Sequence, residues 1–222
     1  MKKGNWLSYI ILLLLFCSCN RKEKLTIYEF DYSDIKMSYG KLPSTSDERI
    51  VFTCAAAFTA TLSEEFSYSN INGIVISDGK SHNLPFKGNY GMFAFINNKP
   101  YFTEKASDEL VRKAKKHKGT LFQQYPIIIN SKRCKVKGPN ELYQFRALCE
   151  KNGRLFIAEA SRSMKYTKFV ELLQKKEVQN AIYLDVGYGW DRAWYRNKRG
   201  KVKWINYFHF SNYPTNFVTF YK

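Results

Sequence analysis

Alternating apolar and polar residues run along much of the chain and predict a fold rich in β-strands. Side chains of a strand point in turn to the two faces of a sheet, so a two-residue period indicates a half-buried strand. The run Ile50–Phe58 is apolar throughout, and we expect it to form a buried strand that leads into a short irregular piece. The other strands expected in the first half are 25–28, 35–39, 73–77, 91–96 and 100–103.

Two segments have the pattern of an amphipathic helix. Ser107 is a good N-cap residue, and the helix that follows is expected to run through Lys116 and stop near Gly119. Thr167 is expected to cap a second helix, whose apolar residues share one face. These residues are Phe169, Leu172, Leu173 and Val178.

Strands also dominate the second half of the chain. Leu121–Ile129 is predicted to be one strand, with Pro126 marking an edge or a bulge. Asn152-Gly153, between strands expected at Leu142–Cys149 and Arg154–Ala160, is the strongest hairpin signal. Mostly antiparallel strands with two helices predict a single α+β domain over residues 25–222. Its remaining strands are expected at 181–184, 193–196, 202–205 and 216–221.

The N-terminal residues 1–18 have the layout of a bacterial lipoprotein signal peptide. Lys2 and Lys3 precede an apolar run over 6–16, which is too short for a confident membrane span. Cys19 after a small residue is the predicted lipidation site, and residues 19–24 form a polar tether. Cys17 as the acceptor and an ordinary cleaved signal peptide are the alternatives. The predicted location is the bacterial cell envelope, lipid-anchored on the periplasmic side or at the outer membrane.

The chain of 222 residues carries a formal net charge of +17. A large positive net charge usually indicates a nucleic-acid partner. An exported lipoprotein rarely meets nucleic acid, so we expect no nucleic-acid partner. The polyanions outside the cytoplasm are phospholipid head groups, lipopolysaccharide and phosphate-bearing glycans. A solvated basic surface that aids solubility is an equally good explanation. The basic clusters lie at 113–118, 132–137, 175–176 and 196–203.

The residues that commonly hold metals or cofactors are sparse and scattered. The histidines have no metal-binding spacing, so no metal site and no cofactor is predicted. Nucleophile-elbow, Walker A and dinucleotide-binding motifs are also missing from the sequence. Three cysteines follow Cys19, so at most one disulfide is expected among them. They are Cys54, Cys134 and Cys149.

The most informative local feature is a strand that delivers a carboxylate to a glycine-containing loop. The apolar run Ala181–Leu184 ends in Asp185, and Gly187 and Gly189 follow. A strand fixes such an acid, while glycines let a ligand approach the backbone closely. A capped strand end with no ligand is the alternative. The same loop holds Tyr188, Trp190, Asp191 and Arg192.

The order of short motifs from Ile50 to Tyr221 resembles the phosphodiester glycosidase family, whose uncovering enzyme removes N-acetylglucosamine from a sugar phosphodiester. Each motif is short, and their shared order over most of the chain carries the resemblance. Six stretches match the family's pattern. They are Ala55–Thr59, Gly73–Lys80, Gln123–Ile129, Arg146–Leu148 with Asn152–Leu155, Ala181–Gly187, and Tyr213–Val218.

The resemblance implies a site built around Asp185 as acid or base and Arg146 as the cation that holds phosphate. It also implies that these two residues meet the Ala55–Phe58 turn in one cleft. A buried Arg146–Asp185 ion pair without catalysis is an equal alternative. Asp191 and Glu150 are candidates for a second carboxylate. Substrate contacts are expected from Gln123, Gly187, Tyr188, Trp190 and Asp191, with Trp194 a further aromatic, although such rings more often serve packing.

The sequence also departs from the family at the expected site. Alanines occupy 55–57, where the family has an asparagine and glycines, and Val186 and Ala147 replace a glycine and a threonine. These changes favour an envelope lipoprotein that binds a phosphorylated or anionic glycan without turnover. An active hydrolase of glycosyl phosphodiesters and an accessory lipoprotein whose basic face lies on the membrane are the alternatives.

Overall fold

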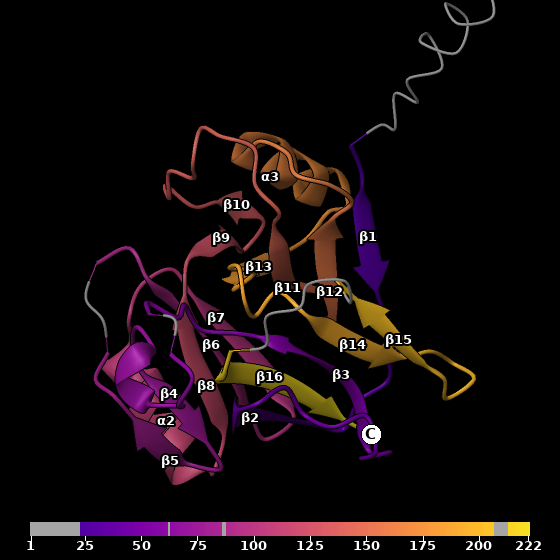
Figure 1. Ribbon diagram of the computed structural model, residues 1–222. Coiled ribbons are helices and arrows are strands. Elements are labelled where there is room, and N and C mark those ends of the chain that lie inside the picture. Colours follow the sequence, from indigo (N-terminus) through magenta and orange to yellow (C-terminus); the bar gives the residue numbers. More distant parts are fainter. Residues whose placement is uncertain (1–22, 62, 86–87, 207–212) are drawn as a thin grey trace, which may run out of the picture.

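The computed structural model describes residues 23–61, 63–85, 88–206 and 213–222. The predicted signal peptide and Cys19 lie outside these residues. The described residues form an α+β domain with three antiparallel sheets and two α-helices, as the residue pattern predicts (Figure 1). Within them, neither helix is long and apolar enough to cross a membrane.

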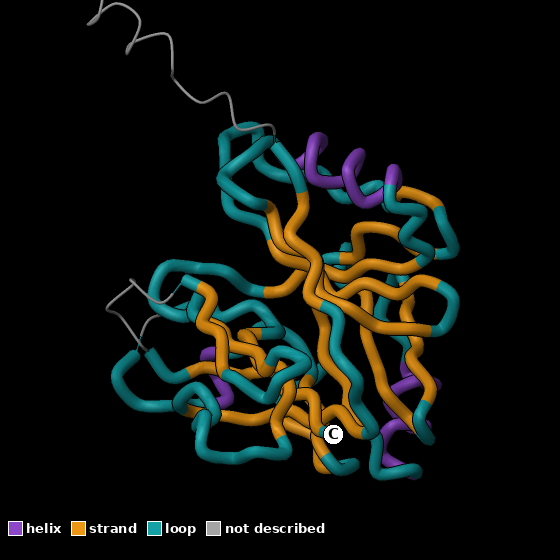
Figure 2. The backbone as a smooth tube through the Cα atoms, turned by 90° about the vertical axis from the view of Figure 1, so that its right-hand side faces the viewer, coloured by secondary structure: helices purple, strands orange, loops and turns teal. Residues whose placement is uncertain are grey.

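The first sheet has six strands and carries the segment that leads to Asp185. Asn152 and Gly153 both have positive φ, which confirms the predicted tight hairpin between β11 (Arg146–Lys151) and β12 (Arg154–Ala160). Helix α3 (Tyr166–Lys175) packs on this sheet through Phe169, Val170 and Leu173, and lies at the top in both views (Figure 1, Figure 2). In spatial order the strands are β1 (Leu25–Tyr28), β12 (Arg154–Ala160), β11 (Arg146–Lys151), β13 (Asn180–Leu184), β9 (Pro126–Ile129) and β10 (Lys132–Arg133).

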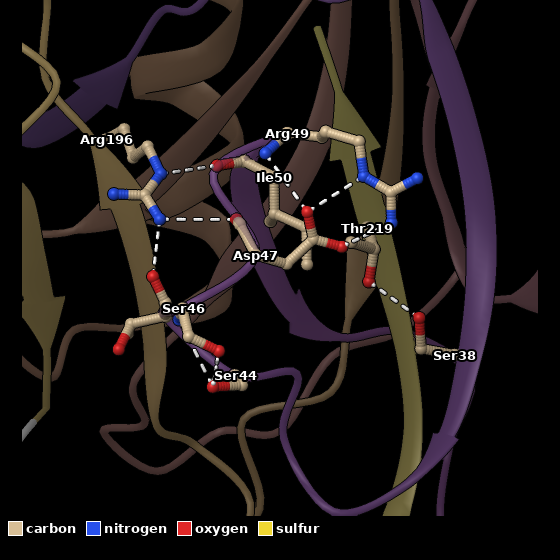
Figure 3. A network of polar contacts seen from close by, with 9 residues as sticks. Ser38, Ser44, Ser46, Asp47, Arg49, Ile50, Arg196 and Thr219 are labelled. Carbon is tan, nitrogen blue, oxygen red and sulfur yellow. Dashed lines mark hydrogen bonds and ion pairs between the residues drawn. The ribbon is translucent and has the colours of Figure 1, made fainter.

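The second sheet has five strands. Its hairpin of β14 (Ala193–Arg196) and β15 (Val202–Ile205) holds the long loop between β2 (Asp34–Gly40) and β3 (Ile50–Ala55). Arg196 of β14 donates from Nε to the Ile50 carbonyl at 3.0 Å and from Nη2 to the Asp47 carbonyl at 3.2 Å (Figure 3). The Trp194 indole donates to the Pro43 carbonyl at 2.9 Å, so this buried ring anchors the same loop. In spatial order the strands are β15 (Val202–Ile205), β14 (Ala193–Arg196), β3 (Ile50–Ala55), β16 (Thr215–Tyr221) and β2 (Asp34–Gly40).

The third sheet also has five strands and is covered by the shorter helix α2 (Asp108–Lys116). The Ser107 side chain accepts a hydrogen bond from the Leu110 amide at 3.2 Å, which confirms the predicted N-cap. Leu110, Val111 and Ala114 of α2 are buried against this sheet. In spatial order the strands are β5 (Lys80–His82), β4 (Val75–Ser77), β8 (Thr120–Gln124), β6 (Gly91–Ile96) and β7 (Lys99–Thr103), and a 3-10 turn η1 (Tyr68–Asn70) precedes them.

The three sheets share one large apolar core. Phe52, Phe122 and Ile157, one from each sheet, are fully buried in the same cluster. The described cysteines Cys54, Cys134 and Cys149 are buried and free. Burial of this apolar area is the dominant stabilising contribution, and it holds the ends of β3, β13 and β16 in fixed positions.

Three predictions about local structure are wrong. Thr167 does not cap α3, because the helix begins one residue earlier, at Tyr166, and its N-cap Lys165 makes no side-chain capping bond. The segment Leu121–Ile129 is not one strand, because the chain leaves the third sheet at Tyr125 and enters the first sheet at Pro126. The predicted bulge is present, since the β13–β9 register shifts opposite Pro126. The strand predicted at Leu142–Cys149 begins only at Arg146.

Candidate functional site

Asp185 follows β13 and lies in the interior, where backbone amides hold both of its carboxylate oxygens. Its side chain Oδ2 accepts from the Thr59 amide at 2.9 Å, and Oδ1 accepts from the Gly187 amide at 3.0 Å. Its own amide donates to the Ala56 carbonyl at 3.2 Å. The residue is only 2% exposed. The carboxylate therefore joins β13 to the alanine turn that follows β3, as the family resemblance implies for these two segments.

Burial raises the pKa of Asp185, because an interior of low polarizability disfavours its charge. The Trp190 indole and the amides of Thr59 and Gly187 act in the opposite direction, since each favours the charged form. The indole N–H lies near the carboxyl but makes no hydrogen bond of normal geometry among the described residues. A side chain at Gly187 would meet Trp190 Nε1 at 2.8 Å, so glycine is required for this close packing.

The alanine turn at 55–57 is held by two further polar side chains. Asn216 of β16 accepts from the Ala57 amide at 2.7 Å and donates to the Ala57 carbonyl at 2.9 Å. Gln124 of β8 donates to the Ala56 carbonyl at 3.3 Å. Both side chains are fully buried. We call Asp185, Thr59, Asn216 and Gln124 the Asp185 cluster, and it connects all three sheets.

Arg146 lies near this cluster but pairs with Glu159, not with Asp185. Its Nε donates to Glu159 Oε2 at 2.9 Å, directly across the β11–β12 ladder. Its Nη2 donates to the Asp191 carbonyl at 2.9 Å, which ties β11 to the loop after Asp185. The predicted ion pair with Asp185 is wrong, because no Arg146–Asp185 bridge occurs among the described residues. Burial opposes the guanidinium charge, but the Glu159 carboxylate raises the pKa of Arg146 above its ordinary range.

The two candidates for a second carboxylate have other contacts. Asp191 is 5% exposed and lies in the loop bound by Arg146. Glu150 accepts from the Gly153 amide at 2.6 Å and from Asn180 Nδ2 at 2.7 Å. It pairs with Asn180 in the ladder, at the opposite end of β13 from Leu184 and Asp185. Glu150 therefore stabilises the β11–β12 hairpin and does not approach Asp185.

Two of the residues predicted to contact substrate, Gln123 and Trp190, are buried in packing contacts. Gln123 is fully buried and accepts from the Ile74 amide at 3.1 Å, so its neighbour Gln124 is the one that reaches the alanine turn. Trp190 is 7% exposed and packs against Ala55 and Phe217. Tyr188, in contrast, is 76% exposed.

An open cavity lies beside the Asp185 cluster and is lined mainly by aromatic side chains. We call it the aromatic cavity, and its volume is about 290 Å³. Phe58 precedes Thr59, whose amide binds Asp185, and Tyr183 is two residues before Asp185 on β13. Lys137 is the one cation that lines it among the described residues. The aromatic residues are Phe58, Tyr125, Tyr143, Phe145, Tyr166 and Tyr183.

Gln124 and Asn216 are amide residues in strands that also carry large apolar residues, and a polar residue in such a strand indicates a buried polar contact. The cavity aromatics come from segments far apart along the chain, so no local pattern identifies them. Within the described residues, no group of three or more His, Cys, Asp or Glu side chains could hold a metal ion.

One solved structure supports the fold resemblance. The catalytic domain of zebrafish N-acetylglucosamine-1-phosphodiester alpha-N-acetylglucosaminidase, auto-inhibited by its pro-peptide, aligns with a TM-score of 0.62 and 10% sequence identity. The alignment covers 90% of this chain and 83% of that chain. A hypothetical protein from Synechocystis aligns with a TM-score of 0.36 and 10% identity, over 90% of this chain and 57% of that one, which supports no inference.

No protein-family model and no curated protein matches the sequence. At 10% identity the likeness to the zebrafish domain concerns the fold alone. The chain therefore has an α+β fold similar to that of a glycosyl phosphodiester hydrolase domain.

Proposed function

We propose that this protein binds a phosphorylated or anionic glycan in the aromatic cavity and does not cleave it. The single observation that carries the proposal is the position of this open cavity beside a buried, fully engaged Asp185 cluster. Pockets of this kind are lined by apolar and aromatic side chains with a few polar groups that set orientation. The aromatic faces suit the apolar side of a sugar ring, and Lys137 suits an anionic substituent.

The contacts of Asp185 and Arg146 favour binding over catalysis. A general acid or base needs to come within about 2.6–3.2 Å of the proton that it transfers. Asp185 is nearly inaccessible and its oxygens already accept from two amides. Arg146 is fully buried, and Glu159 and the Asp191 carbonyl occupy its Nε and Nη2. While both side chains remain buried, Asp185 cannot reach a substrate proton and Arg146 cannot reach a phosphate. The alanines at 55–57 and Val186 point in the same direction.

An active hydrolase is the second candidate, and the raised pKa of Asp185 favours it. A carboxyl group whose pKa is raised by burial retains its proton to higher pH and can act as a general acid. In that mechanism the alanine turn moves away, Arg146 holds the phosphate, and Asp185 protonates the leaving phosphate oxygen as its bond to the anomeric carbon breaks. Water adds to that carbon and loses a proton, so the products are a free sugar and a phosphomonoester.

Two measurements on the same protein separate the candidates. We expect calorimetric binding of N-acetylglucosamine 1-phosphate and no release of free sugar from a sugar-1-phosphodiester. Tyr143→Ala should weaken binding roughly tenfold, since truncating a central aromatic contact typically costs more than 1 kcal/mol. Tyr188→Ala is the matched control, because Tyr188 is also exposed but does not line the cavity.

Sugar release by the wild type would contradict the binding proposal if Asp185→Asn lowered its rate by orders of magnitude, the usual cost of removing a positioned acid. Absence of both binding and release would favour the third alternative, an accessory lipoprotein whose basic face lies on the membrane.

The envelope location rests on the sequence of the N-terminal segment. We propose that Cys19 carries lipid and that residues 19–24 tether the domain to the membrane. Growth with a fatty-acid analogue should label the wild-type protein and leave Cys19→Ala unlabelled. Continued labelling of Cys19→Ala that is lost in Cys17→Ala would identify Cys17 as the acceptor.

A further inference from the structure

A second cavity adjoins the aromatic cavity and is lined by basic side chains. We call it the basic cavity, and its volume is about 510 Å³. Arg133, Lys137 and Lys165 line it, together with Asn140 and Thr167. The two cavities share residues 137–139 and Tyr166. Gly138 lies directly on the Tyr166 ring, where any side chain would overlap it. Ligand atoms on the two sides of this shared wall can therefore belong to one small molecule.

The charge of the basic cavity is uncompensated by the residues that line it. No carboxylate lines it among the described residues, and none of its three cations takes part in a salt bridge there. Some cations elsewhere do form salt bridges, such as Lys151 with Glu177 at 2.8 Å. Two cavities lined by Arg154 also differ, because Glu29 lies among the cations of both and Asp31 among those of one. Three like charges around one hollow favour an anionic ligand.

The start of helix α3 adds hydrogen-bond donors to the same hollow. Its N-cap Lys165 makes no side-chain capping bond, so within the described part of the chain the first amides of this ten-residue helix have no side-chain cap. Such amides, with the positive end of the helix dipole, favour an anion. Tyr166 is 6% exposed, and its hydroxyl has no hydrogen-bond partner within the described residues.

We propose that the basic cavity is a phosphoryl-binding subsite and that the ligand is a sugar phosphate spanning both cavities. The sugar ring lies against the aromatic side chains, and the phosphoryl group lies against Arg133, Lys137 and Lys165. A phosphate monoester carries about −1.5 to −2 charges at neutral pH, so it gains more from three cations than a singly charged diester does. This inference rests on the proposed function and adds a substrate class to it, a sugar phosphomonoester.

The test compares four probes on the full chain by calorimetry and sedimentation. They are N-acetylglucosamine, N-acetylglucosamine 1-phosphate, inorganic phosphate and phosphatidylglycerol vesicles. We expect the sugar phosphate to bind at least about tenfold more tightly than the neutral sugar, with a gain that falls as salt rises. Arg133→Gln with Lys165→Gln should remove this gain and leave binding of the neutral sugar unchanged.

The control is Arg112→Gln with Lys116→Gln, which removes the same charge from exposed positions on α2. The subsite proposal would be overturned if the control lost as much affinity for the sugar phosphate as Arg133→Gln/Lys165→Gln. It would also be overturned if Arg133→Gln/Lys165→Gln still bound the sugar phosphate as much more tightly than the neutral sugar as the wild type does. Preferential retention of the vesicles would overturn it in favour of a lipid head group. The proposed function fails separately, if Tyr143→Ala leaves the binding of both sugars unchanged.

Discussion

The Asp185 cluster and the two cavities are neighbours, yet they use polar groups in opposite ways. In the cluster, Asp185, Asn216 and Gln124 are buried, and they bond to backbone groups of the same chain. In the basic cavity, Arg133, Lys137 and Lys165 are exposed and make no ion pair among the described residues. Buried polar groups need partners, because an unsatisfied one costs about 1–3 kcal/mol. The cluster therefore stabilises the meeting point of the sheets, while the cavities remain free to take a ligand.

Asp185 and Arg146 lie in family-like motifs where catalytic residues would be expected, but both are buried and bonded to groups of the same chain. In the proposal above, the ligand instead contacts the cavities, whose residues Lys137, Tyr143 and Tyr166 lie outside the family-like motifs. If this division is correct, substitutions in the cluster should lower stability, and substitutions in the cavities should lower affinity.

The largest effect is expected for Arg146→Met. This change leaves the Glu159 carboxylate buried without its cation, which typically destabilises a protein by about 3–5 kcal/mol. Urea denaturation gives the free energy of unfolding directly. The matched variant Arg146→Met/Glu159→Leu removes both charges and should recover most of the loss. A single variant as stable as the wild type would contradict a structural role for the pair.

A smaller loss is expected for Asn216→Ala. The substitution leaves the amide and the carbonyl of Ala57 without their partners in a buried turn, at about 1–3 kcal/mol for an unsatisfied group. Asn140→Ala is the control, because Asn140 is exposed and lies in the basic cavity. Equal free energies of unfolding for the two variants would remove the distinction between cluster and cavity.

The stability of the folded protein should depend on pH through the protonation of Asp185. Its folded pKa is raised, so the folded protein binds this proton more tightly than the unfolded chain does. The protonated Asp185 therefore stabilises the folded protein at pH values below its unfolded pKa, near 3.8. This stabilisation is lost as the pH rises through the folded pKa. The free energy of unfolding of the wild type, relative to Asp185→Asn, should therefore fall from about pH 4 towards pH 7. If the free energy of unfolding of the wild type, relative to Asp185→Asn, rose with pH instead, the amide hydrogen bonds would outweigh burial in setting the pKa of Asp185.

The smallest effect on stability is expected for Tyr143→Ala. Tyr143 is half-exposed, and its pairing with Met164 uses backbone atoms, which the substitution retains. The free energy of unfolding should change by no more than about 0.5 kcal/mol. The loss of sugar affinity described above should occur nonetheless, and a large drop in stability would place Tyr143 with the structural residues.

Local pattern was sufficient for much of the fold. The Asn152-Gly153 hairpin and the Ser107 cap depend on residues within a few positions of one another, and both are present. The break at Tyr125 was not predictable, because nothing local tells an apolar run that its two halves join different sheets. The start of α3 was misplaced for a related reason: Thr167 has good cap chemistry, but packing of Tyr166 against the first sheet begins the helix earlier.

Residue pattern alone predicted the α+β class, most strand positions and the basic charge, and it singled out Asp185 and Arg146 as candidate site residues. It did not determine the partners of those two residues. Arg146 lies opposite Glu159 on the neighbouring strand β12 and opposite Leu184 on the other neighbouring strand, β13. Asp185 follows Leu184, so both carboxylates were possible partners of Arg146. The pairing of Arg146 with Glu159 follows from the packing of the three sheets, since hydrogen-bond geometry depends on ångström-scale placement. The same holds for the aromatic cavity, whose walls come from five separate stretches between Phe58 and Tyr183 and exist only after the sheets have packed.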